Sequence, residues 1–366
     1  MIPLFKIHTP SNIGQAIQKV FDEGTITEGK YSDQFEKEFG EMIGNPNIAL
    51  VNSCTSALTL AYRMCDIKPG DKVISTPFTC MATNEPLDTM GAEIIWCDID
   101  PETGNLDPES LKKTIDEYGN NVKAVVGVHW SGNPMKLAQI WEVLFTYPKI
   151  NFIQDAAHAL GSKYCNNFIG FGSSDFTCFS FQAIKHLTTV DGGAISAGKK
   201  EIEEIRKLRW FGLDRKYQGS KWTQDITDSG YKFHMNNVNA VIGLEQMKHI
   251  NKLIDAHKRN GKFYDEHINN SNVKKMKIES WSESSYWIYT LLVEDRDKFQ
   301  EYMHKNGITT DVVHIRNDKY SVFKRFQREL PNTDYFCSRH INIPFGWWLT
   351  EEERQYIVDV VNKYEG

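Results

Sequence analysis

Short, continuous apolar runs that alternate with helical patterns are the feature that most constrains the fold of this chain. Such runs lack the polar alternation of a half-exposed strand, so they are typical of strands buried on both faces. Their alternation with helices, expected at 57–64 and 201–209, predicts an α/β layer with a mostly parallel sheet. The expected strands are residues 72–75, 92–97, 124–129, 151–154 and 175–181.

The alternation of apolar strands with helices ends at about residue 244. The elements expected there are a charged helix at 252–269, a strand at 286–293, a helix at 297–306 and a final helix at 350–364. Thr350, followed by three glutamates, is typical of a helix start. The 366 residues suffice for roughly two domains. We expect a large domain over 1–249, with an N-terminal arm, and a smaller α+β domain over 250–366.

Charge, hydropathy and cysteine usage exclude several classes of protein. The net charge is −6 and no long basic block occurs, so sequence-independent nucleic-acid binding is not expected. No signal peptide and no apolar stretch of about 18 residues is visible, so no membrane span is expected. The seven cysteines are scattered without a CxxC pair, which predicts reduced thiols, no metal site and a cytoplasmic location.

Lys185 is the first candidate for chemistry. It follows the expected strand at 175–181 and precedes the glycine pair Gly192-Gly193, which can allow close backbone approach. A lysine nucleophile needs a lowered pKa, and a pocket at a strand end can desolvate the amine. The alternative interpretation is a surface lysine at a strand end.

Asp155 is the second candidate, because it directly follows the expected strand at 151–154. Open α/β sheets bind ligands at the carboxyl ends of their strands. A carboxylate there can hold the proton of a pyridinium ring and make it a better electron sink. Asp155 could equally be the N-cap of a helix. His158, taken alone, is typical of a packed histidine.

Thr55 and Ser56 form the third candidate, because they lie directly before the helical pattern at 57–64. Free N–H groups and the positive end of the dipole at a helix start attract anions. Simple N-capping explains these hydroxyl residues equally well.

These three segments, in this order, resemble the DegT/DnrJ/EryC1/StrS family of sugar aminotransferases. Further similar segments lie at 24–31, 36–39, 76–79, 98–100, 230–237 and 343–345, so the resemblance covers nearly the whole chain. It implies the fold type I architecture of aspartate aminotransferase. In that architecture a mixed, mostly parallel seven-stranded sheet is sandwiched by helices and joined to a smaller C-terminal α+β domain.

The resemblance implies pyridoxal 5'-phosphate as cofactor and a role for each matching residue. Lys185 would hold the cofactor as a Schiff base and move a proton to and from it. Asp155 would face the ring nitrogen, and His158 would lie against the ring or its 3-hydroxyl. The residues that match the phosphate-binding positions are Thr55, Ser56 and Ser180, with His234 reaching the phosphate from a neighbouring subunit of a homodimer.

One position departs from the family pattern. Relatives usually place an aromatic ring over the cofactor where this chain has Cys80. A sulfur offers less contact area than an aromatic plane. Phe78 is a possible substitute, and core packing is the alternative for it.

The reaction that the resemblance implies is transfer of an amino group from glutamate to a keto group of a nucleotide-linked sugar. A 4-keto-6-deoxyhexose or a 3-keto relative is the expected acceptor, for surface polysaccharide or glycan biosynthesis. A sugar dehydratase on the same fold is one alternative, although that branch carries histidine in place of the lysine kept here as Lys185. A regulatory protein that kept the fold without catalysis is the other.

Six further residues are candidate substrate contacts because of where they lie in the sequence. A strand end carries the first pair, and polar loops carry the rest. Turn formation or aromatic packing explains them equally well. These residues are His129, Trp130, Lys216, Tyr217, His314 and Arg316.

Overall fold

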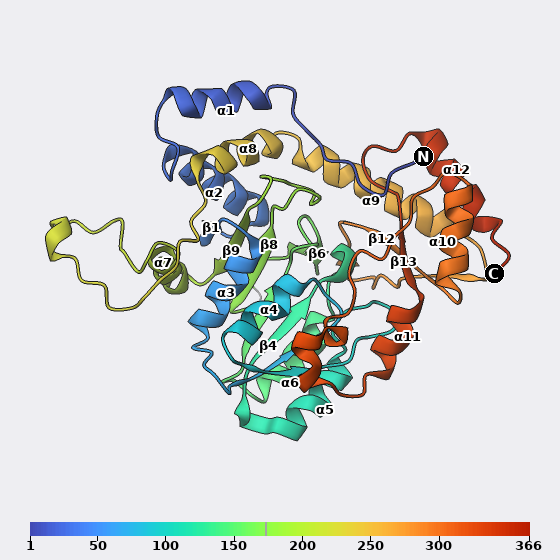
Figure 1. The fold of residues 1–366 in the computed structure, drawn as a ribbon, viewed down its shortest axis with the longest axis horizontal. Helices are drawn as coiled ribbons and strands as arrows, with labels where there is room; N and C mark the ends of the chain where they lie inside the picture. Colours follow the sequence, from blue (N-terminus) through green and yellow to red (C-terminus); the bar gives the residue numbers. More distant parts are fainter. Residues whose placement is uncertain (173) are drawn as a thin grey trace.

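A seven-stranded sheet forms the centre of the computed structural model, which describes residues 1–172 and 174–366 (Figure 1). The strand order is β1-β9-β8-β5-β4-β2-β3. These strands are β1 (Ile48–Val51), β2 (Lys72–Ser75), β3 (Glu93–Trp96), β4 (Val122–Val128), β5 (Asn151–Asp155), β8 (Phe176–Ser180) and β9 (Gly193–Ala197). The mostly parallel seven-stranded sheet expected from the sequence is confirmed.

Strand direction brings the site residues to one edge of the sheet. β2, β3, β4, β5 and β8 are parallel neighbours, whereas β9 is antiparallel to both β8 and β1. β1 therefore runs in the same direction as β8. The carboxyl ends of six strands lie at one edge, which is where open α/β sheets bind ligands.

Among the described residues before residue 250, the structure has eight α-helices. They are α1 (Ile13–Asp22), α2 (Lys30–Ile43), α3 (Cys54–Met64), α4 (Met81–Thr89), α5 (Pro108–Tyr118), α6 (Leu137–Phe145), α7 (Lys199–Leu208) and α8 (Asn237–Met247).

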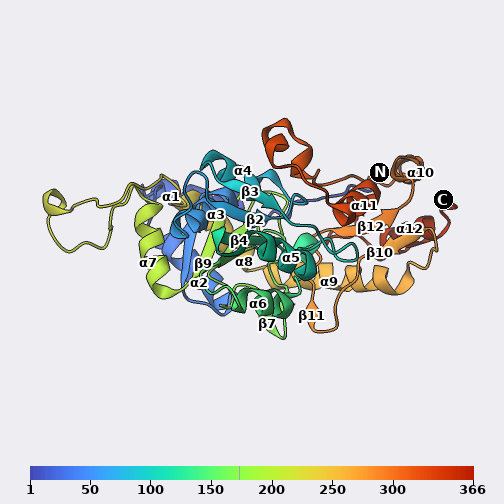
Figure 2. The ribbon, with the colours of Figure 1, turned by 90° about the horizontal axis from the view of Figure 1, so that it is seen from below.

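Helices cover both faces of the sheet because successive strand residues point to opposite faces. In β1, Ile48 and Leu50 join one apolar core, whereas Ala49 and Val51 join the other. The first core also takes side chains from α2, α5, α6 and α8, and the second from α3, α4 and α7. Figure 2 shows α4 and α6 on opposite sides of the strands.

The C-terminal part contains a second, smaller sheet of order β10-β12-β13. Its core is a separate apolar cluster that also takes Phe78 and Trp130 from the first part. A division at residues 249 and 250 stays a prediction, although a new helix begins at Ile250. The elements are α9 (Ile250–His267), β10 (Val273–Lys275), β12 (Tyr289–Val293), α10 (Arg296–Lys305), α11 (Pro331–Arg339), β13 (His340–Ile343) and α12 (Glu351–Asn362).

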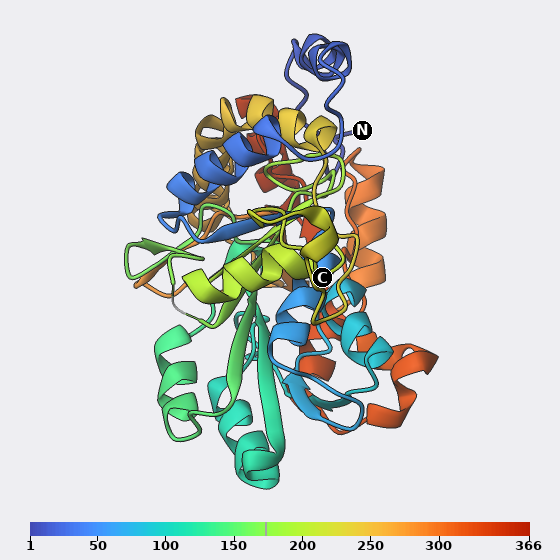
Figure 3. The ribbon, with the colours of Figure 1, turned by 90° about the vertical axis from the view of Figure 1, so that its left-hand side faces the viewer.

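Strand pairing joins the C-terminal part to the rest of the described residues at two places. A small sheet of order β11-β6-β7 pairs β11 (Ser282–Glu283) with the hairpin of β6 (Lys163–Tyr164) and β7 (Asn167–Phe168). The N-terminal arm begins with a bridge between Ile2 and Ile308. It then leads to α1, which packs on α8 at the end of the molecule (Figures 1 and 3).

Local signals placed the last helix correctly. The Thr350 hydroxyl accepts a hydrogen bond from the Glu353 N–H, and the Glu353 carboxylate accepts one from the Thr350 N–H. This capping box starts α12 one residue after the expected start. The expected strand at 286–293 is shorter, because Tyr286 has a φ of 50° that a strand does not accommodate.

The segment between α7 and α8 projects from the body of the molecule (Figures 1 and 2). Trp222 lies in it and is 96% exposed, which is unusual for so large an apolar side chain. Across the described residues, no helix is both long and apolar enough to cross a membrane.

Candidate active site

Lys185 lies in the loop after β8, at the carboxyl edge of the sheet. Its Nζ is 3.5 Å from the centroid of the Trp287 ring. The Trp287 indole N–H donates a hydrogen bond of 3.0 Å to the carbonyl of Ile184. The ammonium thus faces an aromatic plane, and the surface-lysine alternative is wrong.

Burial lowers the pKa of Lys185 to about 8, although Cys80, Asp155 and Cys54 favour the charged form. A larger fraction of this amine is therefore uncharged near neutral pH than for an ordinary lysine, whose pKa is about 10.4. An uncharged amine is the form that attacks a carbonyl.

Asp155 ends β5 and is 3% exposed. Its carboxylate accepts hydrogen bonds from the Thr83 hydroxyl at 2.7 Å and from the Ala157 N–H at 3.0 Å. Burial raises the pKa of Asp155, opposed by these two hydrogen bonds and by Lys185. Turns at residues 157–158 and 160–161, and no helix, follow Asp155, so the helix-cap interpretation is wrong. The carboxylate is instead held at the ligand edge of the sheet.

His158 is buried between rings. Its imidazole stacks on Trp287 with centroids 3.8 Å apart and lies parallel to His314 at 5.5 Å. Burial, with Lys185 nearby, lowers the pKa of His158 well below its ordinary value, so the ring is neutral at pH 7. Its Nδ1 has no partner within the described residues. A buried polar atom of this kind fits a site completed by a bound group.

The start of α3 lies at the same edge. Ser53 is its N-cap and accepts a hydrogen bond of 3.0 Å from the Ser56 N–H. The capping residue is thus Ser53, whereas Thr55 and Ser56 lie in the first turn of the helix, where Thr55 is exposed and Ser56 is buried. Ser180 ends β8, and Gly193 lets β9 approach closely, because a Cβ there would lie 2.7 Å from the Cys54 nitrogen.

An amine, a carboxylate, an unpaired imidazole nitrogen and a helix start therefore meet where β8, β5 and β1 end. These donors and acceptors fit pyridoxal phosphate, which carries an aldehyde, a ring nitrogen, a hydroxyl and an anion. A cavity of about 20 Å³ lies beside Lys185, between the N-terminal arm and Trp287.

No aromatic plane stands at the position where relatives carry one. Cys80 is the N-cap residue of α4 and is partly buried. Phe78 is fully buried with its ring 4.1 Å from that of Trp130, so it packs in the core. Trp287, which sequence motifs did not identify, is the ring beside Lys185.

Three expected substrate contacts are structural instead. His129 is fully buried, with Nε2 at 2.7 Å from Gln154 Oε1 and Nδ1 accepting from the Met135 N–H. Trp130 is also fully buried and donates to the Thr290 hydroxyl.

Arg316 is the third of these corrections. It is 5% exposed, and its guanidinium forms two hydrogen bonds to Asp318 and another to Asp334. A guanidinium whose donors are committed in this way has little left for a substrate.

His314 is the expected substrate contact that lies beside the other site residues. Its ring is parallel to His158, and its Nε2 has no partner in the described part of the chain. Burial lowers the pKa of His314 to about 3. Lys216 and Tyr217 lie instead on the exposed projecting segment, apart from Lys185 of the same chain.

His234 lies at the base of the projecting segment. Its backbone bridges to Val51, next to the start of α3, and its ring is 3.8 Å from Trp210. Burial lowers the pKa of His234 to about 4, and Nδ1 has no partner among the residues described. The histidine thus lies close to the expected phosphate-binding positions of its own chain.

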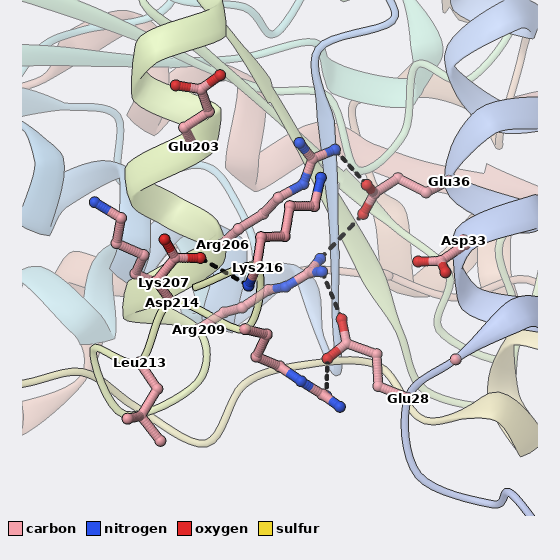
Figure 4. Close-up of a pocket in the computed structure, with 12 residues that line it drawn as sticks. Glu28, Asp33, Glu36, Glu203, Arg206, Lys207, Arg209, Leu213, Asp214 and Lys216 are labelled. Atoms are coloured by element: carbon pink, nitrogen blue, oxygen red, sulfur yellow. Dashed lines mark hydrogen bonds and ion pairs between the residues drawn. The ribbon is translucent and has the colours of Figure 1, made fainter. Parts of the chain in front are cut away.

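The charged cavity, defined here as the space between α2, α7 and residues 213–216, has a volume of about 540 Å³ (Figure 4). Arg209 is paired with Glu28 at 2.6 Å and with Glu36 at 3.0 Å. Arg206 is also paired with Glu36. These two arginines and two glutamates satisfy one another, and Lys185 does not line this cavity.

Comparisons with known proteins show the family of this chain. The profile of the DegT/DnrJ/EryC1/StrS aminotransferase family matches residues 9–362. A UDP-4-amino-4,6-dideoxy-N-acetyl-beta-L-altrosamine transaminase of Campylobacter jejuni is 29% identical, with 94% of this chain and 93% of the relative covered.

Solved structures extend the agreement to the fold. AtS13 from Actinomadura melliaura has a TM-score of 0.95 and 32% identity, covering 100% of this chain and 99% of its own. The sugar aminotransferase CalS13 from Micromonospora echinospora has a TM-score of 0.94 and 31% identity, covering 99% of both chains. The chain therefore belongs to the DegT/DnrJ/EryC1/StrS aminotransferase family and has its fold type I architecture.

Proposed function

We propose that this aminotransferase uses pyridoxal phosphate to move an amino group from glutamate to a keto group of a nucleotide-linked sugar. The observation that carries the proposal is the buried amine of Lys185, with a pKa of about 8, at the strand edge that also presents Asp155. Named relatives act on amino sugars or take part in polysaccharide biosynthesis, which supports a sugar acceptor.

When bound, pyridoxal phosphate supplies an aldehyde and an electron-withdrawing ring. Lys185 would hold it through the amine and then carry a proton from the α-carbon of the amino donor. Asp155 would keep a proton on the ring nitrogen, because its carboxylate is fixed by Thr83 and the Ala157 N–H. His158 would offer its unpaired Nδ1 to the ring hydroxyl.

The anionic end would lie at the start of α3. Thr55, Ser56 and Ser180 supply hydroxyls there, and the helix start supplies N–H groups and a favourable dipole. In this arrangement these groups would hold the anionic end of the cofactor, and Lys185 would remain free to transfer the proton.

We infer a homodimer whose projecting segments pack on the partner. The exposed Trp222 and the exposed Phe211 and Tyr217 form apolar surface that association would bury. Residues at the base of this segment, including His234, would then lie next to the site of the second copy. Two-fold dimers are the commonest soluble assemblies.

We propose a 4-keto-6-deoxyhexose or a 3-keto relative as acceptor, bound on the His314 side of the site. His314 Nε2 is unpaired, so it can donate to or accept from a sugar hydroxyl. A neutral imidazole suits this role because it does not attract a second charged group.

Replacement of Lys185 by alanine tests the proposal. We expect the variant to lose the near-ultraviolet to blue absorbance of the cofactor-loaded protein. It should also lose release of 2-oxoglutarate from glutamate, by a factor of about 10⁴ or more. Lys113→Ala, on the exposed face of α5, is the matched control and should retain both signals.

The same assay separates the alternatives. A dehydratase would act on the nucleotide-linked sugar without releasing 2-oxoglutarate from glutamate. If Lys185→Ala kept both the absorbance and the release of 2-oxoglutarate at the level of the control, the proposed function would be wrong.

A further inference from the structure

Trp287 reaches the site from the C-terminal part of the chain. It lies two residues before β12 and is 2% exposed. Its backbone N–H donates to the carbonyl of Ser131 at 2.9 Å, in the turn after β4. A tryptophan of one part of the molecule is thus anchored directly to the other.

The residue before it is held in an uncommon conformation. Tyr286 has a φ of 50°, and its hydroxyl donates to Asp265 at 2.5 Å. A Cβ at Gly261 would lie 2.5 Å from the Tyr286 ring, so that glycine leaves room for it. Left-handed backbone at a bulky residue persists where the surroundings determine it, and such positions cluster at functional sites. Here the turn ends the strand pattern and directs Trp287 into the site.

Two separate contacts join Trp287 to Lys185. The indole N–H donates to the carbonyl of Ile184, which fixes the backbone just before the lysine. The face of the indole lies 3.5 Å from Nζ, a distance at which a ring attracts an ammonium. The His158 ring also stacks on this indole, with the two ring centroids 3.8 Å apart.

We propose that Trp287 is the positioning residue for Lys185: its ring keeps the amine away from water and beside His158, and its N–H fixes the turn that carries the lysine. The inference rests on the proposed function, in which Lys185 performs the chemistry. It also accounts for aromatic surface beside the amine in a chain that has Cys80 where relatives carry a ring.

The Trp287 ring has two opposite effects on the pKa of Lys185, attraction of the ammonium and exclusion of water, and the groups that face the amine show which is larger. Cys80, Asp155 and Cys54 favour the charged amine. The histidines His158, His314 and His186 are neutral at pH 7, because burial lowers the pKa of each. The ring attracts the ammonium, but it also excludes water, and burial is the larger influence on Lys185. Removing the ring should therefore raise the pKa of the amine.

The test uses the full chain without cofactor and measures how reductive methylation of Lys185, by formaldehyde with cyanoborohydride as the hydride donor, depends on pH, read by peptide mass spectrometry. We expect half-maximal modification near pH 8 in the native protein and about one unit higher in Trp287→Leu. Trp287→Phe keeps an aromatic face, so its midpoint should stay near 8. Because it lacks the N–H, its capture of pyridoxal phosphate should be about 3–10-fold slower.

Trp96→Leu is the matched control, because Trp96 is also fully buried and packs on Phe323 rather than on the site. Its unfolding temperature should fall, with the Lys185 profile unchanged. An unchanged profile in Trp287→Leu, or a Trp96→Leu profile shifted by the same amount, overturns the proposal. If Trp287→Leu fails to fold, Trp287→Phe decides alone: cofactor capture at the native rate refutes the role of the N–H.

These outcomes are separate from the proposed function. The methylation profile needs neither cofactor nor substrate, so it reports on the amine alone. Turnover by Lys185→Ala would refute the function, whereas an unshifted Trp287→Leu profile beside an inactive Lys185→Ala would refute only the role of Trp287.

Discussion

The Lys185 site and the charged cavity hold ionisable groups in opposite ways. In the cavity, Arg206 and Arg209 meet carboxylates of Glu28 and Glu36 directly. At the site, the Lys185 ammonium meets an aromatic face at 3.5 Å. Paired charges keep their ordinary ionised forms, whereas a desolvated amine with an incomplete partner becomes reactive. Reactivity here follows from the way a charge is buried and not from the size of the nearby space.

The pKa values express the same contrast. Burial of Glu36 acts to raise its pKa, but Arg209 and Arg206 outweigh it and the pKa lies below the ordinary value. At Lys185 burial prevails over its carboxylate and thiol neighbours, and the pKa falls to about 8. In the charged cavity the Glu36 carboxylate therefore stays ionised and paired, whereas at the site a larger fraction of the Lys185 amine is neutral and able to react.

After the loss expected for Lys185→Ala, the next largest effect should come from Asp155→Asn, which removes a buried charge at the reactive site. We expect transamination to slow by about 10²–10⁴-fold, the range for loss of a positioned proton-transfer group. An asparagine oxygen can still accept from Thr83 or the Ala157 N–H, so the unfolding temperature should change little. Asp191→Asn, on the exposed turn after Lys185, should leave the rate unchanged. Equal transamination rates in Asp155→Asn and Asp191→Asn would show that Asp155 contributes no more to the reaction than an exposed aspartate.

Glu36→Gln tests the charged cavity. The amide keeps the volume but leaves Arg209, which is 7% exposed, without one carboxylate. We expect a loss of about 3 kcal/mol in the free energy of unfolding, measured by denaturant. Glu41→Gln on the same helix is the control, because its pair with Lys37 is exposed and worth under about 0.5 kcal/mol.

The pH dependence of this loss has a definite sign. A carboxylate whose pKa is depressed on folding stabilises the protein above its unfolded pKa, and that stability disappears as pH falls through the folded pKa. The difference between Glu36→Gln and the native protein should therefore shrink below about pH 4. A difference that is constant from pH 7 to pH 3 would show that the ion pairs do not carry the effect.

The smallest effect concerns the amine itself. Because only the neutral form of Lys185 attacks an aldehyde, capture of pyridoxal phosphate by the cofactor-free protein should speed up as pH rises. We expect about a tenfold gain per pH unit below 8 and a plateau above it. Stopped-flow absorbance measures the rate. If the midpoint of the pH–rate curve lay near the ordinary lysine pKa of about 10.4, Lys185 would behave as an exposed surface lysine and the prediction would be wrong.

Some features of this protein follow from the sequence alone. The strand at 72–75, all but the last residue of β5 and the helix start at Thr350 are visible as local patterns, because strand burial and helix capping depend on neighbouring residues. Lys185 and Asp155 are visible for a related reason: Asp155 comes at the end of one buried strand, Lys185 lies in the loop after another, and parallel strands end at a common edge.

Other features were decided only by the tertiary structure. Trp287 is 102 residues after Lys185 in the chain, and their contact depends on packing between the two parts of the molecule. His129 and Arg316 looked like ligand contacts, yet their partners Gln154 and Asp334 are set by the fold. A local pattern shows which residue can react, but burial and pairing, which set the pKa, come from residues distant in sequence.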